Sequence, residues 1–269
     1  MTSLDSDPQI LSCTNAFTNV VKNFGVGTTS SDFSTSAVKS ALGTLSSSSS
    51  ACPEDVIRSK LTDFYGACTP ELTSSPNSAV ILAYDVLYVL LPLSQAVCAK
   101  DDSGNYCIFE VGSTSNTTKT LLSSGTTPPA NDLWTTLDTG NSRRGQEQVI
   151  IPNVQEFKSL NLVFLGLQSS LPADQLCKTC TRNVLKPYIQ FMSDIPYAPG
   201  PANSPLMSGE SDLYSAVQQK CGAPFLSGSV QAAGGISDGI VSGATGLSVN
   251  IRTVAGALLA IVAGFFITL

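Results

Sequence analysis

The sequence contains no histidine, and only 13% of its residues are charged. Without histidine the chain lacks Ser-His and Cys-His nucleophile pairs, His-ligated zinc and a histidine proton shuttle. The charged fraction lies well below the roughly 25% of an ordinary soluble protein. The net charge of −6 also disfavours nucleic acid, which requires a basic surface. We therefore expect no nucleic-acid partner, no metal and no cofactor.

Aromatic residues are scarce as well, with one tryptophan, Trp134, and seven tyrosines. Grooves that stack sugars use several aromatic faces, so a carbohydrate-active groove is disfavoured. We expect a protein without enzymatic activity. The acid-base chemistry that survives the absence of histidine uses two carboxylates. Asp63, Asp85 and Glu71 are the candidates for that alternative, an anchored hydrolase, although no motif surrounds them.

Cysteine, in contrast, is plentiful. An even number of cysteines in a chain bound for the cell surface predicts up to four disulfides. The eight candidates are Cys13, Cys52, Cys68, Cys98, Cys107, Cys177, Cys180 and Cys221.

The pair Cys177 and Cys180 forms a CxxC motif on a predicted helix. Residues three apart share a helix face, and a bond between them inside a regular helix is geometrically disfavoured. We therefore expect each to bond to a different partner, one near Cys68 or Cys98 and the other near Cys221. The alternative, a redox motif, lacks the strand-helix context of thioredoxin-like folds.

The C-terminus carries the pattern of a glycosylphosphatidylinositol (GPI) anchor signal. The small trio Ser242-Gly243-Ala244 is followed by a short spacer and by the uncharged apolar tail of residues 254–269. We expect the anchor at Ser242, with Gly243 and Gly239 as fallback sites, and removal of the tail. The lipid anchor makes the membrane a partner and predicts the extracellular face of the plasma membrane or the cell wall. Cell-wall polysaccharide or surface proteins are further candidate partners.

A GPI signal requires entry into the secretory route, yet the first ten residues, MTSLDSDPQI, have no apolar stretch of a signal peptide. Two explanations are that the signal peptide lies outside this numbering or that the gene model lost its first exon. A tail-anchored protein facing the cytosol is the third. The cysteines and an N-glycosylation sequon at Asn116 favour the first two.

Helical apolar spacing recurs through residues 1–226, the predicted ectodomain. We expect helices over residues 7–24, 33–42, 79–97, 174–192 (Asp174 to Met192) and 211–220. A further helix is expected to begin at Cys52-Pro53-Glu54-Asp55 and to stop at Gly66. The stretch 79–97 is apolar enough for a transmembrane helix. Asp85, Pro92 and Ser94-Gln95 instead favour a buried core helix, bent or broken near Pro92. Asp85 is expected at a solvent edge or bonded to a neighbouring helix end, a functional buried acid being the alternative.

The rest of the chain is less regular. Cys98 to Cys107 predicts a short hairpin closed by a disulfide, with Asp102-Ser103-Gly104-Asn105 as its turn. Asp101, Asp102 and Asn105 offer calcium ligands, but the twelve-residue calcium loop is absent. Residues 110–149 read as a long irregular insertion that carries Asn116, and 227–253 as a Gly/Ser/Ala-rich stalk. The expected fold is therefore all-α, a disulfide-stapled helical domain with one short hairpin and a long irregular insertion.

A set of short motifs follows in order along the chain. They are Cys52-Pro53, Pro92-Leu93, Cys98, Gly104-Asn105-Tyr106-Cys107, Phe164-Leu165-Gly166, Leu176-Cys177-Lys178-Thr179-Cys180-Thr181-Arg182, Tyr188, Leu213-Tyr214 and Cys221-Gly222. In these residues the chain resembles a family of uncharacterised fungal cell-surface proteins, common in basidiomycetes, that combine a helical cysteine-rich domain with a GPI tail. The likeness spans about residues 10–226 and implies an all-helical, disulfide-stapled, secreted domain with no known catalytic residue.

From the sequence we expect a secreted, GPI-anchored surface or wall protein that is structural or adhesive. The alternative is a binding module for a small apolar ligand such as a sterol or lipid. An apolar pocket of a few hundred Å³ would favour that alternative, and a solid core would remove it.

Overall fold

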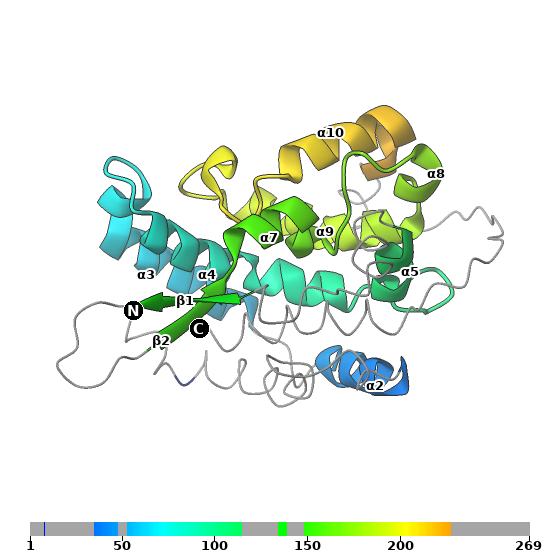
Figure 1. Cartoon of the computed structure of the whole chain (residues 1–269), viewed down its shortest axis with the longest axis horizontal. Coiled ribbons are helices and arrows are strands. Elements are labelled where there is room, and N and C mark those ends of the chain that lie inside the picture. Colours follow the sequence, from blue (N-terminus) through cyan, green and yellow to red (C-terminus); the bar gives the residue numbers. More distant parts are fainter. Residues whose placement is uncertain (1–7, 9–34, 48–52, 115–133, 139–147, 227–269) are drawn as a thin grey trace.

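The computed structural model describes residues 8, 35–47, 53–114, 134–138 and 148–226 (Figure 1). Most of these residues are helical, which confirms the all-α fold class. The elements follow in the order α2 (Thr35–Leu45), α3 (Glu54–Leu72), α4 (Ser78–Val97), α5 (Cys107–Thr114), β1 (Trp134–Asp138), β2 (Gln148–Pro152), α7 (Val154–Leu160), η4 (Leu162–Phe164), α8 (Ala173–Leu176), α9 (Thr179–Asp194), η5 (Pro201–Asn203) and α10 (Glu210–Cys221).

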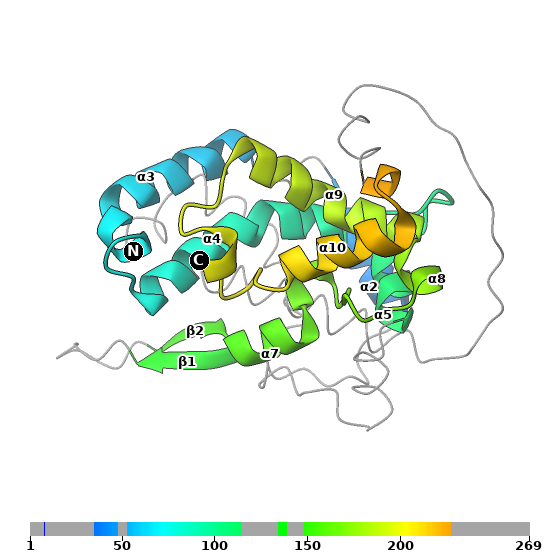
Figure 2. The ribbon, with the colours of Figure 1, turned by 90° about the horizontal axis from the view of Figure 1, so that it is seen from above.

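Helix α4 is the centre of the domain. It packs against α3 and α9 along its length (Figure 2), and most of its side chains are buried. Its first turn is capped by Asn77, whose side-chain oxygen accepts hydrogen bonds from the N–H groups of Ala79 and Val80. The helix runs unbroken through Pro92, so the predicted break there does not occur. By length and composition α4 is able to cross a membrane, but its burial within the protein makes it the predicted core helix.

Helix α3 begins as predicted, just after Pro53, with Glu54 and Asp55 in the first turn. The predicted stop at Gly66 is wrong, because the helix continues to Leu72. The chain is kinked at Cys68, where φ is −125°. The cause is Pro70, which has no N–H for the carbonyl of Gly66 and whose ring displaces that turn.

The insertion predicted to be irregular contains a short antiparallel ladder. Strands β1 and β2 pair with Trp134 opposite Pro152 and Asp138 opposite Gln148. Strand β2 leads directly into α7 (Figure 1), whose first turn is capped by the Asn153 side chain through the N–H of Gln155. The consecutive β-branched residues of β2, Val149-Ile150-Ile151, favour a strand.

The helix predicted from Asp174 to Met192 is two helices. It breaks at Cys177 and Lys178, and Lys178 is extended with φ −103° and ψ 155°. This break separates α8 from α9. Helix α10, in contrast, spans the predicted stretch and ends before Gly222, whose φ of +83° suits glycine.

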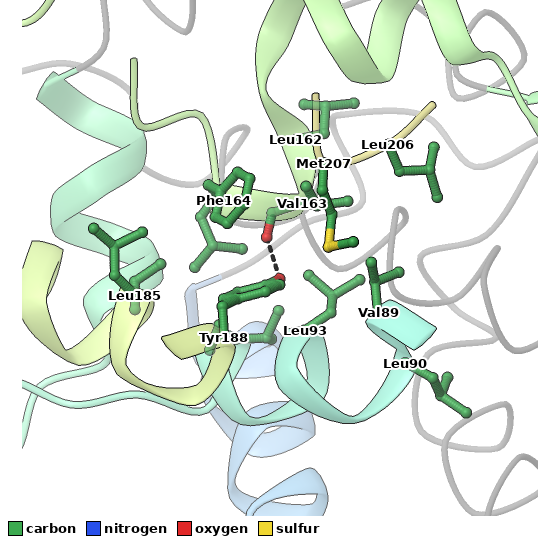
Figure 3. Packing of buried hydrophobic residues seen from close by; sticks show 14 of the residues in the cluster. Val89, Leu90, Leu93, Leu162, Val163, Phe164, Leu185, Tyr188, Leu206 and Met207 are labelled. Carbon is green, nitrogen blue, oxygen red and sulfur yellow. Dashed lines mark hydrogen bonds between the residues drawn. The ribbon is translucent and has the colours of Figure 1, made fainter. Parts of the chain in front are cut away.

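The core between α4, α9 and η4 is centred on Tyr188 (Figure 3). The Tyr188 ring lies 4.7 Å from the ring of Phe164, measured between centroids. Its hydroxyl donates a hydrogen bond to the backbone carbonyl of Val163. Because that carbonyl belongs to a short 3-10 turn inside the core, the tyrosine supplies a donor that the backbone does not.

Candidate functional site

Two disulfides fasten the start of α9 to its neighbours. Cys177 bonds to Cys221 at the end of α10, and Cys180 bonds to Cys107 at the start of α5. An ion pair of 3.2 Å between Lys178 and Glu110 adds to the second link. The two cysteines of the CxxC motif therefore take different partners, as predicted.

The geometric reason differs from the one that predicted this outcome. Cys177 and Cys180 do not share a helix face, because the chain leaves the helical conformation between them. The extended Lys178 lets Cys177 point to α10 while Cys180 points to α5. Of the two expected neighbours, the one at Cys221 is right, but Cys107 takes the place of Cys68 or Cys98.

The predicted disulfide between Cys98 and Cys107 is wrong. The hairpin itself is present, since Lys100 pairs with Tyr106 and the Cys107 N–H donates to the Ala99 carbonyl at 2.8 Å. Cys107, however, is bonded to Cys180. Cys98 and Cys68 are free thiols, each partly buried, and burial raises the pKa of Cys98. Cys13 and Cys52 lie outside the described residues.

The acidic side chains of the hairpin turn accept hydrogen bonds from other groups of the protein. Asp101 accepts hydrogen bonds from the N–H groups of Ser103 and Asn105 at 2.8 and 2.7 Å and from the Asn105 side chain at 3.1 Å. Slight desolvation raises the pKa of Asp101, but these hydrogen bonds outweigh it and hold the pKa below its ordinary value. Asp102 accepts from the Thr179 hydroxyl at 2.9 Å. Within the described residues, no cluster of three or more Cys, Asp or Glu side chains is placed to hold a metal ion.

Asp85 is completely buried on α4, so its predicted place at a solvent edge is wrong. Its carboxyl oxygens lie 2.7 and 2.8 Å from the Ser204 hydroxyl, and one of them accepts the Leu206 N–H at 2.7 Å. The same hydroxyl accepts the Met207 N–H at 2.8 Å. Asp85 thus holds the turn that precedes α10, in keeping with the predicted bond to a neighbouring helix end.

Burial raises the pKa of Asp85 to about 7, since the desolvation of its charge outweighs the hydrogen bonds that lower the pKa. The hydroxyl of Tyr197 also lowers this pKa. That hydroxyl is buried without a hydrogen bond of ordinary geometry within the described residues. Asp85 is therefore a carboxyl poised between its two protonation states near neutral pH.

Glu210, at the first position of α10, is a second buried carboxyl that the sequence did not single out. It is 5% exposed, and burial raises its pKa to about 7. The nearby Tyr214 hydroxyl lowers this pKa, but no hydrogen bond of ordinary geometry joins the two groups. Three buried polar atoms in this part of the described chain have no hydrogen-bond partner. They are Glu210 Oε2, the Tyr214 hydroxyl oxygen and the Ser208 hydroxyl oxygen.

The two other predicted acids do not join Asp85. Asp63 is exposed on α3, and Glu71 is half-buried near the end of the same helix. No hydrogen bond or ion pair in the described parts of the chain links either of them to Asp85. The structure therefore does not assemble the acid pair proposed from the sequence.

A different pair of carboxylates meets on the surface. Glu54 and Asp194 line an open groove of about 410 Å³ beside α4 and α9, together with Leu91, Gln95, Pro187, Ile189, Gln190, Phe191 and Ser193. Arg58 bridges the pair, contacting Glu54 and lying 2.9 Å from Asp194 through the same Nη2 atom. Sequence gave no signal for this pair, because its members lie 140 residues apart and only folding brings them together.

The groove fits neither alternative chemistry well. A two-carboxylate hydrolase needs one of its acids to hold a proton, whereas a guanidinium placed between Glu54 and Asp194 makes the three groups an ion-pair network. A sterol or lipid needs enclosed apolar walls. This groove is open, and its rim carries Gln95, Gln190 and Ser193 besides the two acids.

The remaining predicted sites lie outside the described residues. They are Asn116 for glycosylation, Ser242, Gly243 and Gly239 for the anchor, and the tail 254–269. Comparison of the chain with protein-family models, curated proteins and solved structures finds no match.

Proposed function

We propose that this chain is a secreted surface or wall protein without enzymatic activity, held on the outer membrane face by a GPI anchor. In this proposal the helical domain is a stable structural or adhesive unit. The C-terminal stretch from about residue 227 connects it to the membrane, and Ser242 carries the anchor. This assignment agrees with what the resemblance to fungal surface proteins implies.

The observation that carries the proposal is the double fastening of α9 by Cys177–Cys221 and Cys180–Cys107. Disulfides persist in oxidising compartments and are rare in the reducing cytosol. Two structural disulfides in one helical domain therefore support the secretory route that a GPI signal needs. They also argue against a tail-anchored protein facing the cytosol.

The proposed lack of enzymatic activity is supported by the contacts that the acidic side chains make within the protein. Asp85 accepts a backbone N–H and a serine hydroxyl, and so holds a turn within the core. The surface acids Glu54 and Asp194 are bridged by Arg58. Each of these arrangements stabilises the folded chain and engages Asp85, Glu54 and Asp194 in contacts within the protein.

The test is enzymatic release from intact cells. Cells that express the full chain are treated with a phosphatidylinositol-specific phospholipase, after inositol deacylation where this is needed. We expect release of the protein, and we expect its intact mass to lack the residues from about Gly243 onward, the apolar tail 254–269 included. A protein that stays bound and retains Phe265-Phe266 would overturn the anchor and favour a membrane-spanning tail.

A control variant sharpens the test. Replacing the whole trio Ser242-Gly243-Ala244, together with Gly239, by bulky residues should block attachment, because the anchor is transferred only to small residues. The variant should then keep its tail and resist the phospholipase. Phospholipase release of this variant at the level of the unmodified chain would contradict the assigned attachment region.

A further inference from the structure

Two buried carboxyls lie at the two ends of one short segment. Asp85 of α4 binds the segment at Ser204 and Leu206, and Glu210 lies at its other end, at the start of α10. Between them Leu206 and Met207 are 1% and 0% exposed, and they belong to the same buried cluster as Val89 of α4 (Figure 3). The segment 204–210 is therefore docked into the core through both apolar and acidic groups.

The surroundings of both carboxyls are uncharged. The groups that interact with Asp85 are Ser204, Leu206, Tyr197, Tyr84 and Tyr88. Those that face Glu210 are tyrosines of three helices, Tyr88 of α4, Tyr188 of α9 and Tyr214 of α10. Among the described residues, no lysine or arginine contributes to the pKa of either carboxyl. A negative charge at either position is thus buried without a cation to compensate it.

We propose that the segment Ser204–Glu210 is an acid-stabilised latch, which stays docked on α4 while Asp85 and Glu210 hold protons and loosens as they ionise. The charge of Glu210 is the less well compensated of the two, because its Oε2 is buried without a hydrogen-bond partner among the described residues. Asp85 retains its donors in either protonation state.

The direction of the pH dependence follows from linkage. Docking raises the pKa of both acids to about 7, from ordinary values of 3.8 and 4.5. The docked state therefore binds protons more tightly than the open one. The stabilisation is fully present below about pH 4, and it is lost as the pH rises through about 7. A protein exposed to an acidic exterior would hold the latch closed.

Hydrogen exchange measured on the full chain tests the latch directly. Exchange of the Leu206 and Met207 amides is compared with that of α3 at a series of pH values from 5 to 8, after correction for the intrinsic exchange rates. When opening of the segment releases protons, the equilibrium constant for opening rises by up to about tenfold per pH unit for each proton released. We expect opening of the segment to rise more than tenfold relative to α3 over this interval.

The double variant Asp85→Asn/Glu210→Gln should lose this pH dependence, whereas Asp63→Asn, at an exposed acid on α3, should retain it. Each single variant should remove part of it. Should the double variant fail to fold, Ser204→Ala gives a separate readout, because loss of a donor to the ionised Asp85 should move the midpoint to higher pH. Equal pH dependence in the segment and in α3, or an unshifted midpoint in Ser204→Ala, would overturn the latch.

Discussion

Tyr188 shows how a single hydroxyl stabilises this core. Its side chain is fully buried, and its O–H donates to the Val163 carbonyl. Tyr188→Phe keeps the ring beside Phe164 but leaves that carbonyl unpaired. We expect the free energy of unfolding to fall by about 1–2 kcal/mol, measured by denaturant titration. Tyr65→Phe, at a ring that is 40% exposed, should change it by less than about 0.5 kcal/mol. Equal effects of the two substitutions would contradict this account.

Two glycines should respond to alanine with opposite signs. At Gly66, inside α3, an added Cβ meets no atom within 4 Å. Because alanine is the better helix former, Gly66→Ala should stabilise the protein by about 0.5–1 kcal/mol. At Gly209 the Cβ would lie 2.8 Å from Oδ1 of Asn161.

Asn161 is buried and donates through Nδ2 to the Leu167 carbonyl, so its side chain has little freedom to move. Gly209→Ala should therefore destabilise the protein by about 1–3 kcal/mol. Melting temperatures of the two variants give the comparison. A Gly209→Ala protein as stable as the Gly66→Ala protein would show that the Asn161 turn is more pliable than the structure indicates.

At the scale of the elements, several helix starts, helix ends and buried stretches could be predicted from neighbouring residues alone. The Pro53-Glu54-Asp55 start of α3, the apolar run of α4 and the Gly222 end of α10 each depend on a few neighbouring residues, and each prediction holds. The stop at Gly66 and the break at Pro92 are local predictions that fail, whereas the failures at the candidate site involve distant partners. Cys177 leaves its helix to reach Cys221, and Asp85 is buried because Ser204, 119 residues away, supplies a donor.

The disulfide pattern can be read from tryptic peptides prepared without reduction. Cleavage after Lys178 separates Cys177 from Cys180. We expect the peptide Ser159–Lys178 to be tied to the one that begins at Cys221. The peptide Thr179–Arg182 should be tied to Asp101–Lys119, which contains Cys107.

The free thiols provide an internal control for that experiment. Cys68 and Cys98 both fall on the peptide Leu61–Lys100, which should take up two alkylating groups after denaturation without reductant. A link from this peptide to Asp101–Lys119 would restore the hairpin disulfide between Cys98 and Cys107. A link between Ser159–Lys178 and Thr179–Arg182 would instead favour a redox CxxC.

At the scale of the whole molecule, the two disulfides among the described residues close two long loops of the chain. Cys107–Cys180 spans 73 residues, and Cys177–Cys221 spans 44. Closing loops of these lengths in the unfolded chain contributes about 4 kcal/mol each. The whole stability of a domain is about 5–15 kcal/mol. Reductant should therefore lower the melting temperature sharply.

Serine substitutions distinguish the structural cysteines from the others in this measurement. Cys180→Ser should lower the melting temperature and reduce the further effect of reductant, because it opens the longer loop in advance. Cys68→Ser, at a half-buried free thiol, should leave both quantities nearly unchanged. A melting curve of the unmodified chain that is indifferent to reductant would mean that its cysteines are free thiols, as in a protein of the reducing cytosol.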